Sequence, residues 1–271
     1  MPVTIKRVES KKDLREFVNF PLSLYKGVPQ FVPAIHFDEM DTLNPKKNAA
    51  FDFCEAEYYL AYKDGEIAGR VAAIINHKAN ETWHHKEVRY GWFDFIDDRE
   101  VSAALLESVV KFGRERGMDT ISGPLGFVDM DPEGMQVEGF EHMSTMSLRY
   151  NYPYYMEHMG ALGYEKEVDW LEYHVYPPKE VPERYVRLSK IVSEKFGVHV
   201  RKVTRRAVRK EGIGEKLFAL INETYANIYN YTQIPDNMVK TFVGFYLGVI
   251  NLDYITLVED EKKNIVAFGI I

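Results

Sequence analysis

The chain has 271 residues, 46% of them apolar, which is enough for one large or two modest domains with a buried core. Its formal charge of -7 argues against a general nucleic-acid binder, and a single cysteine excludes an internal disulfide or a thiolate zinc cluster. Because the N-terminus lacks an apolar signal core and no apolar run could span a bilayer, the sequence predicts a cytoplasmic protein without a transmembrane segment.

The first quarter of the chain predicts a strand, two helices and a hairpin. Residues 3–8 alternate as a strand does, and Ser10 then caps a helix that Pro21 should end or kink. A proline-punctuated stretch holds at most a short second helix near residues 35–41. Residues 57–74 form two strand-like runs around Asp64-Gly65, the signal of a β-hairpin.

Residues 88–126 read as strand, helix, strand, and the rest of the chain is organised around them. Residues 88–96 are aromatic and β-branched, and Asp97 followed by Glu100 suggests a capping box. The crossover favours parallel strands, with 88–96 central and separating from residues 120–123 at its carboxyl end. Ligands in such sheets bind at the helix N-terminus, so we expect the site at residues 94–103.

The element order begins again after a proline-rich linker. Asn151 opens a helix, residues 164–176 predict a long strand, and a second strand–helix–hairpin run occupies residues 198–271. We therefore expect domains at 1–176 and 198–271, joined by a linker and helix at 177–197. The second copy stops in mid-strand, as in a truncated form of a longer protein. Its open edge should pair with another element, and a homodimer through this incomplete domain is one such arrangement.

This order resembles that of the GNAT acyltransferase superfamily, in an α/β (α+β) class with a mixed twisted sheet flanked by helices. The segment from Asn151 to Leu162-Gly163-Tyr164-Glu165-Lys166 is similar to the superfamily's "N…LGFEK" segment. Shorter pieces resemble a long bacterial GNAT-like group, among them Ser122-Gly123-Pro124 and Tyr150-Asn151-Tyr152-Pro153.

The resemblance implies an N-acyltransferase that moves an acyl group from acetyl-CoA or a longer acyl-CoA to a small-molecule or lipid amine. It implies that the pantetheine arm pairs with the strand at Phe95 and Ile96 and is held by the Asn151 amide. The implied pyrophosphate site is the set of backbone N–H groups of Arg99, Glu100, Val101 and Ser102, a helix start with unpaired donors.

The sequence departs from the superfamily pattern at two positions. The glycine-rich phosphate loop is replaced by acidic residues at 97–100, which repel phosphate. Met159 stands where many relatives carry the tyrosine that protonates the leaving thiolate. Tyr155, or Tyr154 beside it, would then be the acid. The missing glycines favour a second hypothesis, a non-catalytic GNAT-fold module that has lost coenzyme A.

Asp94 is the predicted general base, because a carboxylate among Trp92, Phe93 and Phe95 would be desolvated. A solvated or hydrogen-bonded strand carboxylate is the alternative. The acidic loop 129–141 suggests a lid or an amine-attracting rim. Six basic residues at 201–210 suggest either a solvated face or a phosphate or RNA site. No metal site is expected.

Overall fold

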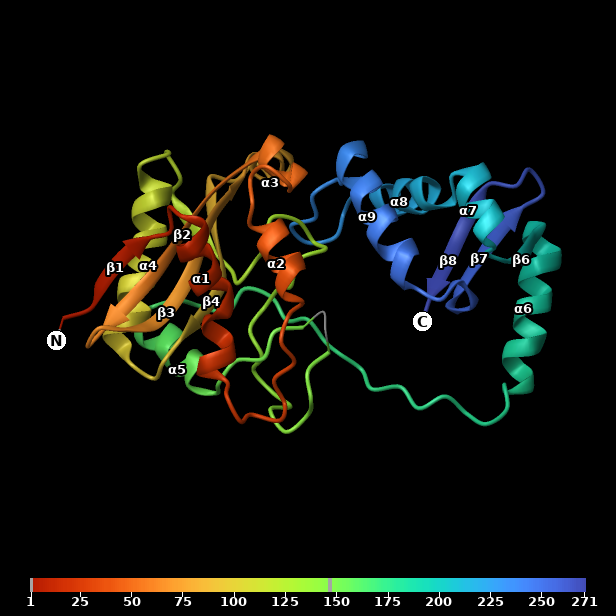
Figure 1. The fold of residues 1–271 in the computed structure, drawn as a ribbon. Coiled ribbons are helices and arrows are strands. Elements are labelled where there is room, and N and C mark those ends of the chain that lie inside the picture. Colours follow the sequence, from red (N-terminus) through yellow and green to blue (C-terminus); the bar gives the residue numbers. More distant parts are fainter. Residues whose placement is uncertain (1, 146–147) are drawn as a thin grey trace. The chain divides into compact units, whose positions relative to one another are not determined.

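The structure of the chain, a computed structural model, describes residues 2–145 and 148–271. The chain divides into two compact units, Met1–Trp170 and Leu171–Ile271 (Figure 1). In the described part of the chain, none of the helices combines the length and apolarity needed to cross a membrane.

The first unit is a five-stranded sheet covered by helices on both faces. Its sheet order is β1-β2-β3-β4-β5, with antiparallel pairs except for the parallel β4–β5 pair. The elements, in chain order, are β1 (Thr4–Arg7), α1 (Lys11–Leu24), α2 (His36–Thr42), a 3-10 turn (Ala49–Asp52), β2 (Cys54–Lys63), β3 (Glu66–Asn76), α3 (His77–Trp83), β4 (Glu87–Phe95), α4 (Arg99–Arg114), β5 (Thr120–Ser122) and α5 (Tyr154–Ala161). The predicted mixed sheet is confirmed.

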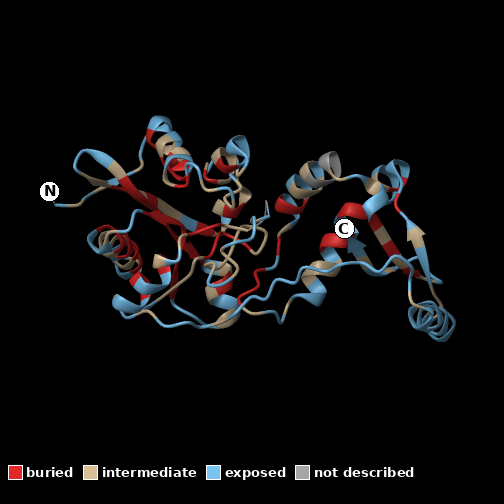
Figure 2. Cartoon of the chain, turned by 90° about the horizontal axis from the view of Figure 1, so that it is seen from below, coloured by how far each residue is buried: buried red, intermediate tan, exposed pale blue. Residues whose placement is uncertain are grey.

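The core of this unit lies between the sheet and α4, as the red segments of Figure 2 show. Val101, Leu105, Val109 and Phe112 recur at helical spacing on α4 and are at most 2% exposed. They pack with alternate residues of β3 and β4 and with α5. Helix α1 packs on the opposite face through Phe17. The sheet is thus buried on both faces around β3 and β4, which explains the near-continuous apolar sequence of β3.

Several local predictions are confirmed and others are wrong. Ser10 and Asp13 form the expected capping box, but α1 continues through Pro21 to Leu24. Asp98, not Asp97, caps α4. Strand β4 has neighbours on both sides but is the fourth of five strands rather than the central one. Residues 164–176 form no strand, and most of their side chains are exposed.

The second unit contains a three-stranded antiparallel sheet of order β6-β7-β8. Its elements are α6 (Glu183–Phe196), β6 (Val198–Lys202), α7 (Arg205–Glu211), α8 (Ile213–Thr224), α9 (Asp236–Val249), a 3-10 turn (Leu252–Tyr254), β7 (Ile255–Asp260) and β8 (Ile265–Ile270). The order strand, helices, hairpin repeats that of β1 to β3, as predicted, with three helices in place of two. In the described sheet β8 bonds only to β7, so pairing of its free edge stays a prediction.

A long loop follows β5, and its described residues, 123–145 and 148–153, are partly buried. The Leu125 amide donates to the Tyr90 carbonyl at 2.8 Å, next to Gly91, where a side chain would collide with the Leu125 carbonyl. Asp131 accepts hydrogen bonds from the amides of Phe127 at 2.8 Å and Val128 at 3.2 Å. The predicted acidic lid is therefore anchored along its first part.

Two carboxyl groups of this loop should make the protein more stable at pH 5 than at pH 7.5. Burial raises the pKa of Asp131 to about 6 and that of Glu133 to about 7, whereas unfolded carboxyls titrate near about 4. Between these values the folded state binds more protons than the unfolded chain, so stability falls as the pH rises. We expect a loss on the order of 2 kcal/mol across this window.

The double variant Asp131→Asn/Glu133→Gln should lose most of that pH dependence in urea unfolding at pH 5 and pH 7.5. The exposed Glu165→Gln replacement is the matched control and should keep it. Equal pH dependence in the double variant and the wild type would contradict the assignment.

Candidate functional site

The candidate site lies where β4 and β5 separate. The two strands pair only at Glu87–Arg89 and Thr120–Ser122, and β4 continues to Phe95 paired with β3 but not with β5, which confirms the predicted separation. A β-bulge shifts the β3–β4 register between Arg70 and Ala72, and Trp92 opposite it has a φ of 46°, in the left-handed region. A bulky residue rarely adopts this backbone, and such positions concentrate at functional sites.

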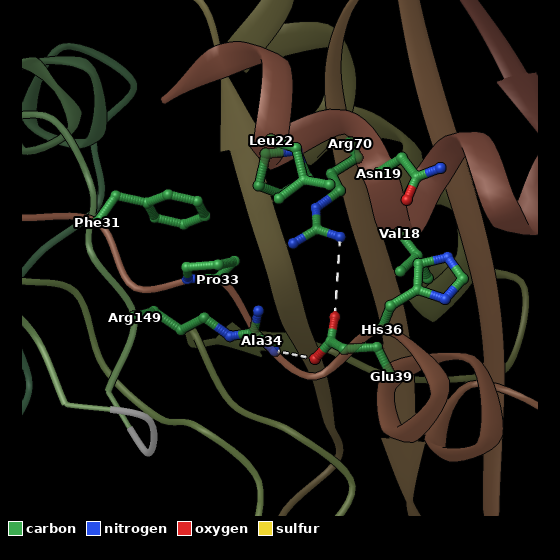
Figure 3. A pocket seen from close by; sticks show the side chains of 11 residues that line it. Val18, Asn19, Leu22, Phe31, Pro33, Ala34, His36, Glu39, Arg70 and Arg149 are labelled. Atoms are coloured by element: carbon green, nitrogen blue, oxygen red, sulfur yellow. Dashed lines mark hydrogen bonds and ion pairs between the residues drawn. The ribbon is translucent and has the colours of Figure 1, made fainter. Parts of the chain in front are cut away.

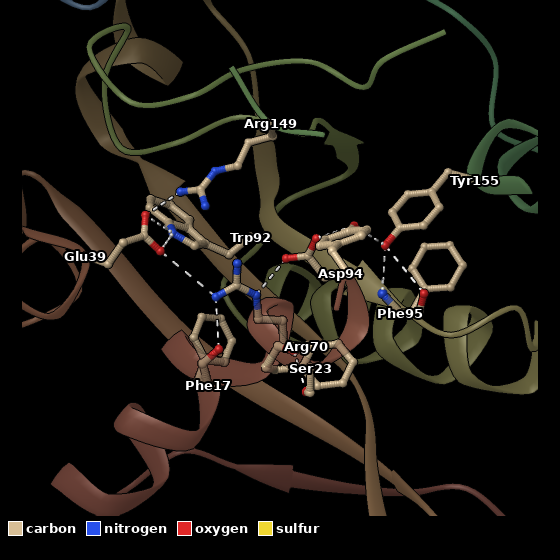
Figure 4. Close-up of polar contacts among 11 residues, drawn as sticks. Phe17, Ser23, Glu39, Arg70, Trp92, Asp94, Phe95, Arg149 and Tyr155 are labelled. Atoms are coloured by element: carbon tan, nitrogen blue, oxygen red, sulfur yellow. Dashed lines mark hydrogen bonds and ion pairs between the residues drawn. The ribbon is translucent and has the colours of Figure 1, made fainter. Parts of the chain in front are cut away.

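Asp94 points from β4 toward α1 and meets two polar side chains rather than an aromatic shell (Figure 4). The Arg70 guanidinium of β3 donates to one carboxylate oxygen at 2.7 Å, and the Tyr25 hydroxyl donates to the other at 2.8 Å. Phe93 and Phe95 alternate onto the α4 face of the sheet. The predicted aromatic surroundings of Asp94 are thus wrong for Phe93 and Phe95, because the strand's period of two turns them to the other face, and the alternative of a hydrogen-bonded strand carboxylate holds.

Tyr155 of α5 reaches the same cluster from the other side. Its hydroxyl lies 2.9 Å from the Tyr25 hydroxyl and accepts the Phe95 amide hydrogen at 2.9 Å. Tyr154 instead donates to the Phe95 carbonyl at 2.5 Å. Burial, followed by the Asp94 charge, raises the pKa of both Tyr25 and Tyr155 well above the ordinary value, so both phenols stay protonated.

The proton positions in this chain of groups follow from its donors and acceptors. Since the Tyr25 proton is committed to Asp94, the Tyr155 proton is directed to the Tyr25 oxygen at 2.9 Å, with the Phe95 carbonyl as a longer alternative acceptor at 3.4 Å. The result is a directed relay, Tyr155 to Tyr25 to Asp94, that links the predicted acid to the predicted base. Any group that gives a proton to the Tyr155 oxygen can therefore deliver one to the Asp94 carboxylate.

Arg70 also contacts α1 and lies near a second carboxylate, that of Glu39 in α2. It donates to the Phe17 carbonyl at 2.9 Å and lies 4.0 Å from Glu39, which also accepts from the Trp92 indole at 3.0 Å and pairs with Arg149. Burial opposes ionisation of Glu39, but the two guanidiniums outweigh it and lower its pKa. A cavity of about 30 Å³ adjoins Glu39, Arg70 and Arg149 (Figure 3), room for about one water molecule.

Three of the four predicted pyrophosphate donors at the start of α4, the amides of Glu100, Val101 and Ser102, are engaged within the chain. Asp98 accepts hydrogen bonds from the amides of Glu100 at 2.9 Å and Val101 at 3.4 Å through its side chain, and from the Ser102 amide at 3.2 Å through its carbonyl. The Asp98 carboxylate in turn pairs with Lys63. Arg99 is the first residue of α4, and Ile96 precedes the cap, where its amide donates to the Ala68 carbonyl at 2.9 Å. The residues present do not fit a coenzyme A diphosphate here, because a carboxylate occupies its place.

Asn151 and the Ser102 side chain are likewise engaged. The Asn151 amide group accepts from the Gln136 amide at 2.7 Å and donates to the Gln136 carbonyl at 3.1 Å, which ties the acidic loop to the start of α5. The Ser102 hydroxyl lies 2.8 Å from His158, whose other ring nitrogen lies 3.0 Å from Asp97. These contacts join α4 to α5.

Within 2–145 and 148–271, no three His, Cys, Asp or Glu side chains are grouped so as to hold a metal ion. A wider groove of about 740 Å³ is lined by residues of α1, α2 and β2, and none of the predicted site residues lines it.

The sequence did not reveal Tyr25, Arg70, Glu39 or Arg149 as members of the site. For Arg70 there was a signal, an arginine within the otherwise apolar run of β3, because a buried charge requires a partner. Nothing distinguishes Tyr25 from the other 17 tyrosines before folding.

Comparison with known proteins gives two relatives by sequence and one informative structure. Protein YghO of Escherichia coli (strain K12) is 32% identical over 162 residues, which are 60% of this chain and 41% of that protein. The chain thus spans less than half the length of this relative. Bacterial ceramide synthase of Caulobacter vibrioides (strain NA1000 / CB15N) is 22% identical over 264 residues, 96% of this chain and 68% of that protein. No protein-family model matches.

Among solved structures, a tandem GNAT protein from the clavulanic acid biosynthesis pathway aligns with 98% of this chain and 73% of its own, at a TM-score of 0.52 and 8% identity. At this identity the likeness concerns the fold. It extends over both units of the chain and agrees with the repeated order of strand, helices and hairpin.

Proposed function

We propose that this chain, which has the GNAT fold, is an N-acyltransferase that moves an acyl group from a thioester to an amine. The observation that carries the proposal is the relay from Tyr155 through Tyr25 to Asp94, with spacings of 2.9 and 2.8 Å, at the end of β4. The resemblance suggests acyl-CoA as the donor. The ceramide synthase relative suggests a lipid amine among the candidate acceptors.

In the proposed reaction the amine nitrogen attacks the thioester carbon, a C–N bond forms, and the C–S bond breaks. The proton that the nitrogen loses passes to the Tyr155 oxygen as Tyr155 gives its own proton to Tyr25 and Tyr25 gives its proton to Asp94. The reverse transfer then delivers a proton from Tyr155 to the leaving thiolate. The net result is an amide and a thiol, with Asp94 returned to its carboxylate form.

The surroundings of the relay support this division of roles. Because the pKa of each phenol is raised, neither Tyr25 nor Tyr155 would hold a negative charge, and Asp94 is the group that stores the proton. Arg70 fixes the carboxylate through one oxygen and leaves the other to Tyr25. A positioned relay of this kind typically contributes 10²–10⁴-fold to a rate (order of magnitude).

A second candidate, a GNAT-fold binding module without catalysis, is favoured by one observation. The start of α4 is capped by the Asp98 carboxylate and Asn151 is bound to Gln136, so the groups expected to hold coenzyme A have partners within the chain. For the domain organisation, we propose that residues 1–176 form the acyltransferase domain, 177–197 a connecting segment, and 198–271 a partial second GNAT-like domain.

Product analysis decides between the two candidates. Wild-type protein is incubated with acetyl, octanoyl and palmitoyl thioesters and with amines that include an aminoglycoside and a long-chain amino alcohol. Thiol release and amide mass are then measured. We expect amide formation above the uncatalysed rate in at least one pair. Thiol release without amide, or no reaction in any pair, would reject acyl transfer and leave the binding module.

A further inference from the structure

The first turn of α4 carries a cluster of carboxylates in addition to the hydrogen bonds that cap it. Three carboxylates, Asp97, Asp98 and Glu100, lie within four residues, and Lys63 pairs with two of them, Asp98 and, at 3.1 Å, Glu100. The third, Asp97, lies beside His158. A diphosphate brought to this turn would meet three negative side chains, the exposed Arg99 guanidinium, and one ammonium group already shared between two of the carboxylates.

The Asp98 carboxylate is also well stabilised where it is. The Lys63 ammonium, assisted by the amides of Glu100 and Val101, lowers its pKa, so it stays ionised at neutral pH. An anionic side chain at a helix N-terminus satisfies the orphan amides and the helix dipole. A diphosphate would therefore have to displace a bound anion of the protein itself, and residues 96–102 contain no glycine that would allow a closer approach.

From these observations we infer that the site takes its donor as an S-acyl pantetheine arm and makes no use of a nucleotide diphosphate. The inference rests on the proposed acyl transfer and specifies its donor. The same acyl arm is presented by coenzyme A and by the prosthetic group of an acyl carrier protein. The chain should recognise the part that these two sources share.

Three donors with one acyl chain separate the possibilities: acyl-CoA, S-acyl pantetheine and an acylated carrier protein. We expect kcat/KM for acyl-CoA and S-acyl pantetheine to agree within about threefold, since the nucleotide adds no binding energy. Adenosine 3′,5′-bisphosphate should not inhibit. A preference for acyl-CoA of about tenfold or more, with competitive inhibition by the nucleotide, would overturn the inference. A higher kcat/KM for the carrier protein than for both small donors would support it and identify that source.

Different results would reject the proposed acyl transfer and the inference about its donor. No product from any of the three donors would reject acyl transfer itself, and with it the donor inference. Product from all three with a clear dependence on the nucleotide would leave acyl transfer in place and reject only the inference.

Asp98→Ser tests the physical cause. Serine keeps an N-cap acceptor, so α4 should retain its first turn, which circular dichroism and the melting temperature can verify. The carboxylate is gone, and the ratio of kcat/KM for acyl-CoA to that for S-acyl pantetheine should rise by about tenfold. Asp119→Ser, an exposed carboxylate outside this turn, is the matched control and should leave the ratio unchanged. An unchanged ratio in a folded Asp98→Ser variant would contradict the role of Asp98.

Discussion

Replacement of Tyr25 by phenylalanine should lower the turnover of amide formation by about 10²–10⁴-fold, because it removes the only hydroxyl that the hydrogen bonds place between Tyr155 and Asp94 in the described structure. The ion pair between Asp94 and Arg70 stays intact. Stability should fall by about 1–3 kcal/mol, since one oxygen of a buried carboxylate loses its donor. Steady-state thiol release and urea unfolding measure the two effects separately.

Tyr58→Phe is the matched control for this variant. Tyr58 is also buried and also donates one hydrogen bond, to the Leu43 carbonyl at 3.0 Å, but it does not contact the relay. It should lose stability without losing turnover. If the two variants turned over substrate at rates within a few-fold of each other, Tyr25 would have no part in proton transfer.

Asp94→Asn should produce a loss of turnover in the same range of about 10²–10⁴-fold, with donor affinity nearly unchanged. The double variant Tyr25→Phe/Asp94→Asn gives a sharper result. Two groups of one relay are not additive, so the double variant should be about as slow as the slower single variant. A multiplicative loss would mean that Tyr25 and Asp94 act independently.

Arg70→Met should lower the free energy of unfolding of the first unit by about 3–5 kcal/mol, because it leaves the Asp94 carboxylate buried without its cation. Arg70 is 1% exposed, so the carboxylate loses its cation away from bulk solvent. All three tryptophans, Trp83, Trp92 and Trp170, belong to the first unit, so their fluorescence during urea unfolding reports on this unit alone.

Two further variants complete the measurement. Arg70→Met/Asp94→Leu removes both charges and should recover part of the stability, since an apolar pair replaces a buried ion pair at little cost. Lys12→Met breaks an exposed pair with Glu16 at 3.8 Å and should change stability by about 1 kcal/mol or less. A loss below about 1 kcal/mol in Arg70→Met would show that the Arg70–Asp94 pair contributes little.

The parts of the fold that the sequence predicted are those set by local signals. The Asp64-Gly65 turn, the Ser10 cap and the apolar stripe of α4 each depend on residues close together in the chain. Residues 164–176 carry a strand-like composition, but a strand also needs a neighbour to bond with, and in the described structure none pairs with them.

The site was predicted only in part for a related reason. Asp94 and Tyr155 stood out because of the strand and helix that carry them. Tyr25 is 69 positions from Asp94 and 130 from Tyr155, and no local pattern marks a contact over such separations. The cation on Asp94 changes its chemistry from that of a desolvated carboxylate to that of one held by an ion pair, which no composition of strand β4 could reveal.

The bulge at Trp92 determines the face of the sheet on which Asp94 lies. Gly91 faces Ile74 and Leu125, Trp92 donates to Glu39 on the same side, and Phe93 is the next residue on the α4 side. Regular alternation is thereby broken once, and Asp94 falls on the face that holds Arg70. If the strand instead ran through Trp92 in strict alternation, without the bulge, every residue beyond Gly91 would exchange faces. The carboxylate would then point at the leucine and valine stripe of α4, and a phenylalanine would face the guanidinium, so the pairing of Asp94 with Arg70 depends on the extra residue that the bulge accommodates.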